Sequence, residues 1–434
     1  SLASKPLPIE PNQAGLLASG SATGGAPARD ADGTSASCDP LLRVPGVCAE
    51  KVRQIIEGGM WDLRSVVDAL GCLGRLGWYT DSAAAAALSH CMQVSLLEAH
   101  SPLLLPLVRS CVALRMHHAP LLHKVVTWYS WCYTYLRPKP LSAEHLEEIL
   151  ELAEQLLELG FQSLELQNIL ADNLKNPNAS SRQVLLLLAA LARSAHFPAE
   201  FKHACSRIST GSADSDLASL SNADLIKAFN IHLCGVFDGP AGLKHWLTED
   251  EAMKAFFQAH TSQKWYQNQD KQRATFLQSD AYVTLRDAAD AEGLELRPSD
   301  AGEVYHVELV SRDARARLSD WANNPPTALI CLKSKEQLQW YVPVAADGAI
   351  EVDPAQNRCH HFRFMFRGAV QKIRHLQAIG YRPAVVWMSE WNCLKTLEER
   401  REYLRDVIAT SGGGADDARQ KAAFIPSSEQ DAYV

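Results

Sequence analysis

One pattern of apolar residues returns five times between residues 62 and 247. Within each copy the leucines and other apolar residues stand three or four positions apart, which places them on one face of an α-helix. The copies begin at Leu63, Leu103, Leu146, Gln183 and Ala223. A break and a second apolar helix follow, as at residues 81–91 and 119–129. A period of about 40 residues is typical of stacked two-helix repeats, so the pattern predicts an α-solenoid over residues 44–247.

A different pattern, typical of an α/β layer, occupies the C-terminal third of the chain. Residues 369–379 carry apolar side chains at helical spacing, and Gly380 supplies a left-handed stop. Residues 384–388 are a short apolar, β-prone run. Thr396 and Glu399 form a capping box for a last helix through Ile408. The order of helix, strand and helix predicts a small α/β domain over residues 275–409.

Composition delimits the remaining segments. With 434 residues, 47% of them hydrophobic, the chain can bury at least two cores. Residues 1–43 are predicted to be an extended, low-complexity tail. Residues 248–274 are predicted to be a polar connector, and residues 410–434 a flexible tail unless they dock. The chain begins at Ser1, which a removed targeting peptide and a shortened sequence would explain equally well.

The cysteines and histidines predict neither a disulfide framework nor a metal site. Eleven cysteines are scattered without a CxxC pair, which favours reduced thiols in a cytosol-like or matrix-like compartment. Adjacent histidines, as at 117–118 and 360–361, point in different directions on a helix or strand, so neither pair is predicted to bind metal. No cofactor is predicted. The densest apolar run, residues 184–192, is half the roughly 20 residues that span a bilayer, so no membrane partner is expected.

One segment is strongly basic although the net charge of the chain is −8. Between Pro354 and Ser389 there is no Asp or Glu, while six Lys or Arg and three His are present. Such a segment indicates either an anionic partner or an acidic neighbour in the fold. On a helix over residues 369–379, Lys372, Arg374 and His375 are expected on the exposed side. The candidate anion-binding residues are Arg358, His361, Arg363, Arg367, Lys372, Arg374, His375, Arg382 and Lys395.

Residues 361–367 alternate basic and aromatic side chains. On a strand, Phe362, Phe364 and Phe366 would lie on one face and the arginines at 363 and 367 on the other. The phenylalanines are interpreted as core residues, and base stacking by one of them is the alternative.

The same C-terminal residues resemble a known family. The helix Lys372-Ile-Arg-His-Leu-Gln-Ala-Ile-Gly-Tyr381, the strand after it and the pair Glu390-Trp391 resemble the end of the RAP domain, a small module of organellar RNA-metabolism proteins. Upstream, residues 276–286 are similar to the opening helix of that family and residues 304–310 to its first strand. The apolar repeats resemble the degenerate helical repeats that precede RAP domains in FAST kinase-like and octotricopeptide proteins. This resemblance implies an organellar RNA-binding protein, with the candidate residues above as its RNA-binding residues.

RAP domains are similar to the restriction-endonuclease fold, whose nucleases hold a metal ion with an acid followed by an acid-x-Lys pair. Between Glu295 and Val434 no Asp or Glu stands two positions before a Lys. Two alignments are open: residues 351–353 correspond to the Glu-x-Asp strand of the family, or residues 327–333 occupy that strand and the acids are missing. The catalytic set is incomplete in both, so no enzyme activity is predicted. Trp391 is interpreted as a core residue, with base stacking as the alternative.

The third repeat is acidic, because residues 140–174 hold seven Glu and one Asp but no Lys or Arg. A phosphate backbone would be repelled there, so this surface is expected to face solvent or a basic protein. An acidic net charge and long tails suit a fixed place in a ribonucleoprotein better than free scanning of RNA. The chain is therefore predicted to be a non-catalytic rRNA-binding subunit of a mitochondrial ribosome, in the mitochondrial matrix with rRNA and other proteins of the assembly as partners. The alternatives are a free mitochondrial or chloroplast RNA processing or stability factor and, second, a divergent metal-dependent nuclease.

Overall fold

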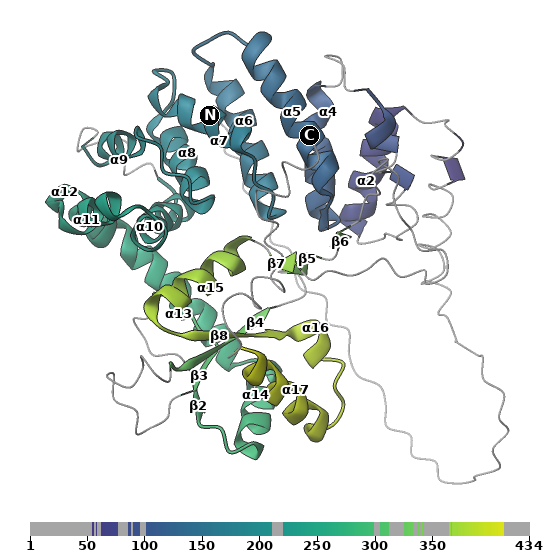
Figure 1. Ribbon diagram of the computed structural model, residues 1–434, viewed down its shortest axis with the longest axis vertical. Coiled ribbons are helices and arrows are strands. Elements are labelled where there is room, and N and C mark those ends of the chain that lie inside the picture. The colour runs from purple at the N-terminus through teal and green to yellow at the C-terminus, as the bar shows by residue number, and fades with distance from the viewer. Residues whose placement is uncertain are drawn as a thin grey trace, which may run out of the picture. The chain divides into compact units, whose positions relative to one another are not determined.

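The computed structural model describes residues 54–55, 58, 62–76, 86–87, 90–95, 101–210, 220–298, 304–311, 325–332, 337–338, 340–341, 364–365 and 367–411. Within this part the chain is mostly helical, with a small mixed sheet of four strands (Figure 1). The predicted tail at residues 1–43 lies outside the described residues, as does all but the first two residues of the tail predicted at 410–434.

All five apolar segments that were predicted to be helices are helical. They are α2 (Leu63–Leu76), α4 (Ser101–Ala113), α6 (Ala143–Glu158), α8 (Ser181–Arg193) and α10 (Asn222–Phe237). Each contacts the next along the chain, α2 with α4, α4 with α6, α6 with α8 and α8 with α10. The second helices are α5 (Ala119–Tyr135), α7 (Leu164–Asp172), α9 (Phe201–Thr210) and α11 (Ala241–Glu249). Helix α5 contacts α4 and α7, α9 contacts α8, and α11 contacts α10, so the helices are packed in neighbouring pairs.

Serine side chains begin four of these helices. Ser142, Ser163, Ser180 and Ser221 each accept a hydrogen bond from a backbone N–H in the first turn of α6, α7, α8 and α10. In α8 and α10 the third helical residue returns the bond and completes a capping box. A cap of this kind contributes about 1 kcal/mol, so these serines set where each helix starts.

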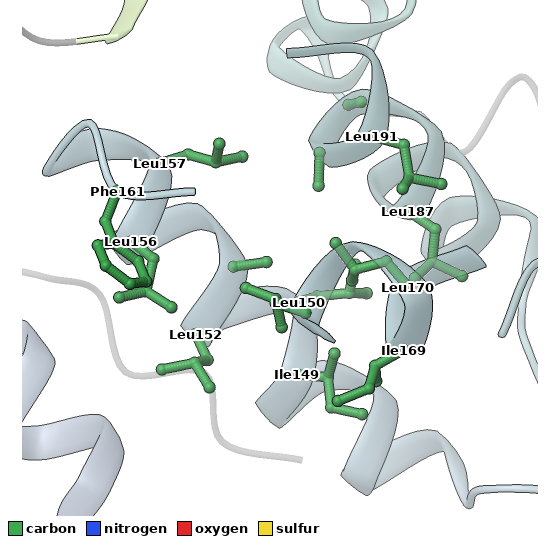
Figure 2. Close-up of a cluster of buried hydrophobic side chains, with 14 of the residues drawn as sticks. Ile149, Leu150, Leu152, Leu156, Leu157, Phe161, Ile169, Leu170, Leu187 and Leu191 are labelled. Carbon is green, nitrogen blue, oxygen red and sulfur yellow. The ribbon is translucent and has the colours of Figure 1, made fainter. Parts of the chain in front are cut away.

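Leucine and isoleucine side chains from successive helices form the core of the helical part. Figure 2 shows side chains of α6, α7 and α8 in this core, among them Leu150, Leu170 and Leu187. Ile149 and Leu187 are 0% exposed. Full burial of one such side chain contributes about 1.5–3 kcal/mol, which explains why the helical spacing of the apolar positions predicted these elements.

Helix α5 begins with a buried histidine. His118 is the N-cap of α5, and its Nδ1 accepts a hydrogen bond from the Leu121 backbone N–H at 3.1 Å. Burial, and then the nearby His117, lowers the pKa of His118 to about 4. Protonation would therefore cost free energy in the folded state, and it would also replace the acceptor of the cap with a second N–H donor.

This histidine predicts a loss of stability in acid. The unfolded chain binds a proton near the ordinary histidine pKa of about 6.5, whereas folded His118 resists protonation down to about 4. The contribution of neutral His118 to the free energy of unfolding is therefore complete above pH 6.5. It falls by up to about 3 kcal/mol as the pH drops from about 6.5 to about 4. His118→Asn keeps a capping acceptor and removes the titration, so its unfolding free energy, measured with denaturant between pH 7 and 4, should decline less steeply. His123→Asn, on the same helix, is the control, and parallel profiles for both variants would contradict the prediction.

The segment predicted as a polar connector is helical. It contains α12 (Glu251–Lys254), the π-helical η4 (Ala255–Thr261) and α13 (Ser262–Leu277). Trp265 of α13 is 7% exposed and its Nε1 donates to the Val304 carbonyl oxygen at 2.5 Å. This helix therefore packs against the segment that leads into the sheet.

The sheet lies between two layers of helices. Its strands are β2 (Leu296–Arg297), β3 (Leu309–Ser311), β4 (Thr327–Leu332) and β8 (Arg382–Trp387), in the order β2-β3-β4-β8. Only β4 and β8 are parallel. Strand β4 is buried along its length. Leu329 and Cys331 belong to the core with α14 (Asp280–Ala291) and α17 (Leu397–Thr410), whereas Ala328 and Ile330 belong to the core with α15 (Arg367–Ile379), α13 and α10.

The local predictions for this domain hold, with shifted boundaries. The helix predicted at 369–379 begins two residues earlier as α15, and Gly380 ends it with a φ of +105°. The strand predicted at 384–388 spans Arg382–Trp387 and includes Pro383. Proline is tolerated because β8 is an edge strand and needs hydrogen bonds on one side only. The capping box of Thr396 and Glu399 is confirmed.

The upstream predictions and the 361–367 strand are borne out only in part. Of residues 276–286, the first two end α13 and a new helix, α14, begins after the N-cap Ser279. Of residues 304–310, only the last two belong to β3. Within 361–367 the described strand is β7 (Phe364–Met365), which pairs with β5 (Gln337–Leu338). Arg367 begins α15, so its predicted place on a strand was wrong.

Candidate functional site

Helix α15 carries most of the candidate residues that the structure describes. One side of it packs on the sheet through Leu376, which is 2% exposed, and Ile373. Another side contacts α10, the last of the five apolar helices, through Gln371, Arg374 and His375. Helix α15 is thus buried on two sides, against the sheet and against α10.

Asp238, the C-cap residue of α10, is at the centre of this contact. Arg374 Nε donates to Asp238 Oδ1 at 2.6 Å, and Arg374 Nη2 donates to Oδ2. His375 Nε2 lies 2.9 Å from Oδ2. Burial alone would raise the pKa of Asp238, but the hydrogen bonds from His375 and Arg374, together with their charges, hold it below its ordinary value. Asp238 is therefore a charged partner for α15, with a side chain that is 7% exposed.

The hydrogen bonds continue from His375 into a buried network. His375 Nδ1 lies 2.6 Å from Tyr305 Oη, in the segment before β3. Gln371 Nε2 donates to Asn230 Oδ1 at 2.5 Å and to Cys234 Sγ at 3.2 Å. Burial raises the pKa of Tyr305 well above its ordinary value, so this phenol stays neutral. The network joins α10, α15 and the segment that enters the sheet.

The expectation that Lys372, Arg374 and His375 lie on an exposed side was wrong for His375 and only partly right for the two cations. His375 is 0% exposed, because α10 covers it. The side chains of Lys372 and Arg374 are 17% and 35% exposed. Lys372 Nζ lies 3.5 Å from Glu308 Oε2. Asp238 and Glu308 are thus acidic neighbours of the basic segment, and RNA binding by the three residues stays a prediction.

The structure describes the side chains of two other candidates, Arg382 and Lys395, and neither is bonded to this network. Arg382 Nη2 donates to Thr327 Oγ1 at 2.8 Å, at the start of β4. Lys395 is exposed in the turn before α17. The side chain of Arg367 and the whole of Arg358, His361 and Arg363 lie outside the described residues.

Four glutamates of the acidic segment at residues 140–174 are paired within the chain, among them Glu148 with Arg137 at 2.7 Å. Helix α6 contributes Glu151, Glu147 and Glu154, and its neighbours α4, α8 and α10 contribute the cations. The other pairs are Arg109 Nε with Glu151 at 2.5 Å, Arg182 with Glu147 at 3.9 Å, and Lys227 with Glu154 at 2.8 Å. Solvent and a basic partner were the two interpretations of this charge, and pairing with neighbouring helices is a third that local sequence did not suggest.

The strands carry little of a nuclease site. Strand β4, one of the two candidates for the acid-bearing strand, has the sequence TALICL and no carboxylate. Glu308 precedes β3 and is 8% exposed, and Lys372 lies beside it. Residues 351–353, the other candidate, lie outside the described part of the chain.

The interpretation of Trp391 as a core residue is confirmed. Trp391 is 1% exposed, and its Nε1 donates to Thr284 Oγ1 at 3.0 Å. Tyr403 lies edge-on to it at 5.9 Å between ring centroids, and the guanidinium of Arg400 lies 5.8 Å from its ring. The indole is therefore closed off from a stacking base.

Neither a family model nor a curated protein matches this chain. In the part that the structure describes, no helix combines the length and the apolar character needed to cross a membrane.

Proposed function

We propose that this chain is a non-catalytic RNA-binding protein, built from an α-solenoid and a C-terminal RAP-like domain. One observation carries the proposal. The segments that resemble the RAP family meet at one small sheet: β8 is a strand of it, α15 packs on one face, and Trp391 lies in the core on the other face. Paired helices precede it, as the resemblance to FAST kinase-like and octotricopeptide proteins implies.

The RNA-binding surface of this proposal consists of Lys395, which is exposed, and four basic residues whose side chains lie outside the described part of the chain. These four are Arg358, His361, Arg363 and Arg367. Arg374 and His375 instead hold the domain to α10, because a guanidinium that makes two bonds to a buried carboxylate cannot also bind a phosphate in the same way. Lys372 lies close to Glu308, and Arg382 donates to Thr327. Both side chains are therefore assigned to holding the domain together rather than to the RNA-binding surface.

The place of action is proposed to be a mitochondrial ribosome, in the matrix, with rRNA and ribosomal proteins as partners. The net charge of −8 and the internal pairing of the acids on α6 favour a protein held at one site over one that scans RNA. Sedimentation of native extract through a sucrose gradient tests this. The chain should travel with the ribosomal subunits at high salt, whereas a free processing factor would leave them and move to the light fractions.

Removing the proposed RNA-binding cations is expected to weaken RNA binding by an electrostatic route. Arg363→Ala, Arg367→Ala and Lys395→Ala together should lower the slope of log affinity against log salt concentration by about one for each phosphate that the variant no longer binds. The measurement is a salt titration of binding of the full chain to rRNA fragments. Arg109→Ala with Lys227→Ala, which removes two cations of α4 and α10, is the control and should leave the slope unchanged. Equal slopes for all proteins, with the fold intact, would place the RNA-binding surface elsewhere.

We expect no cleavage of RNA or DNA with Mg²⁺ or Mn²⁺. Strand β4 offers no carboxylate to a metal ion, and Glu308 faces the Lys372 cation. The assay is incubation of the full chain with labelled RNA and DNA, with a heat-denatured sample as control. Cleavage that disappears in a Glu308→Gln, Glu351→Gln and Asp353→Asn variant would refute this part of the proposal.

A further inference from the structure

The contact between α10 and α15 brings together three residues with the chemistry of metal ligands. They are Cys234 and Asp238 from the end of α10 and His375 from α15, and their ligand atoms all lie within 4.8 Å of one another. Among the described residues no other group of three has this property. Cys234 and Asp238 are four positions apart, so one face of the helix presents both of them.

We propose that Cys234, Asp238 and His375 bind one divalent transition-metal ion of the zinc class. A thiolate, an imidazole nitrogen and a carboxylate oxygen form a mixed ligand set that Zn²⁺ accepts. Mg²⁺ and Ca²⁺ require mostly oxygen ligands and do not fit. Zinc binds these atoms at about 2.0–2.3 Å, so neighbouring ligands must be roughly 3–4 Å apart. His375 Nε2 and Asp238 Oδ2 are 2.9 Å apart, a hydrogen-bond distance, so they must separate slightly to admit the metal, and Cys234 Sγ lies within 4.8 Å of both.

The residues around these ligands supply the supporting hydrogen bonds that metal sites use. Tyr305 Oη lies 2.6 Å from His375 Nδ1, where it can accept the N–H of the tautomer that leaves Nε2 free for the metal. Arg374 donates to both carboxylate oxygens, with Nε 2.6 Å from Asp238 Oδ1 and Nη2 bonded to Oδ2, so the metal would take the place of the Nη2 contact while the Nε contact holds the carboxylate. Gln371 Nε2 donates to Cys234 Sγ at 3.2 Å, which favours the thiolate over the thiol.

The charges and protons balance. On binding, the Cys234 thiol loses its proton to solvent. His375 binds through Nε2 as the neutral ring with its one proton on Nδ1, so the Nε2 proton that bonds Asp238 also leaves, to solvent or, in a neutral ring, to Nδ1. The thiolate and the Asp238 carboxylate then offset the two charges of the metal. Arg374 is the remaining cation, and its side chain is 35% exposed, so water can solvate it. The metal would join α10 to α15 through three protein ligands, with water in the fourth position, and it would fasten the α/β domain to the helical part.

Cobalt(II) tests the proposal, because a thiolate bound to it gives a charge-transfer band in the near ultraviolet. The full chain is used in a background that lacks competing thiols. In it Cys72 and Cys393, which are exposed, and Cys38, Cys48 and Cys359, which lie outside the described residues, are replaced by serine. One equivalent of cobalt should produce the band, and one equivalent of zinc should remove it.

The variants assign the ligands. Cys234→Ser should abolish the band, and His375→Gln should weaken cobalt binding at least tenfold. Tyr305→Phe removes a supporting hydrogen bond and should weaken it about 10–100-fold while the band keeps its shape. Cys205→Ser, at another buried cysteine, is the control and should change nothing. A band that persists in Cys234→Ser would overturn the proposal.

A second measurement is independent of whether those variants fold. Native mass spectrometry of the folded background protein, first treated with a chelator and then given a tenfold excess of zinc, should show one bound zinc per chain. The thermal midpoint should also rise with zinc concentration, because the assembled site of the folded chain would bind zinc more tightly than the scattered side chains of the unfolded chain. A chain without bound zinc, or with a constant midpoint, would show that the three residues form a hydrogen-bonded contact only.

Discussion

Replacing Asp238 with alanine is expected to lower the free energy of unfolding by about 3 kcal/mol. The substitution leaves the Arg374 guanidinium and the buried His375 ring without their carboxylate partner. Breaking a buried ion pair by removal of one member costs about 3–5 kcal/mol, and the exposed third of Arg374 places this case at the lower end. Equilibrium denaturation in the presence of a chelator measures the effect without any contribution from metal.

An exposed ion pair of the same chain provides the matched control. Glu151 pairs with Arg109, and their side chains are 36% and 52% exposed, so Glu151→Ala should cost less than about 1 kcal/mol. A double-mutant cycle of Asp238→Ala with Arg374→Met should give a coupling energy above about 1 kcal/mol. Equal costs for Asp238→Ala and Glu151→Ala would show that the contact between α10 and α15 contributes little.

The helices and the last strand could be predicted because their signals are local. The spacing of leucines, the stop at Gly380 and the capping box at Thr396 depend on residues within a few positions of one another. Two boundaries moved: α15 begins at Arg367, two residues after β7, and β8 begins at Arg382, where it pairs with Thr327 of β4. Sheet pairing joins β8 to β4, which is some 50 residues earlier, and no local pattern contains that information.

The candidate site was harder to predict because α15 is buried on two sides. Its apolar spacing indicated the side that faces the sheet, and by that spacing His375 belonged to the other, exposed side. Helix α10 covers that other side, and Asp238 lies more than 130 residues before His375 in the chain. The absence of acids between Pro354 and Ser389 did indicate that an acidic neighbour was one of two explanations, but it did not indicate which acid.

The acidic helix α6 had the same difficulty. Its sequence contains no Lys or Arg, so its carboxylates were expected to face solvent or a basic partner protein. One cation, Arg137, stands eleven residues before its partner Glu148, but the others are on α4, α8 and α10, 35 to 73 residues away, and become neighbours only when the helices stack. Charge counted within one helix therefore says little about the charge of a face that several helices build.

Replacing Trp391 with alanine is expected to cost about 3–5 kcal/mol of unfolding free energy, the range for a large aromatic side chain in a core. The indole is 1% exposed and packs with Leu404 and Met388 in the core that the sheet forms with α14 and α17. Its removal also leaves Thr284 Oγ1 without the Nε1–H donor at 3.0 Å. The measurement is equilibrium denaturation of the full chain, followed by the signal of the remaining tryptophans.

Two variants separate this structural role from base stacking. Trp391→Phe keeps an aromatic ring but loses the hydrogen bond and part of the volume, so it should cost less than the alanine variant and leave RNA affinity unchanged. Trp131→Ala removes an indole that is 41% exposed, and it should cost less than about 1 kcal/mol. Because the Trp391 ring is enclosed by Tyr403, Arg400 and the sheet, a base could reach it only if the domain opened. A Trp391→Phe protein of normal stability that no longer bound RNA would therefore contradict the enclosed indole and assign it to the RNA-binding surface.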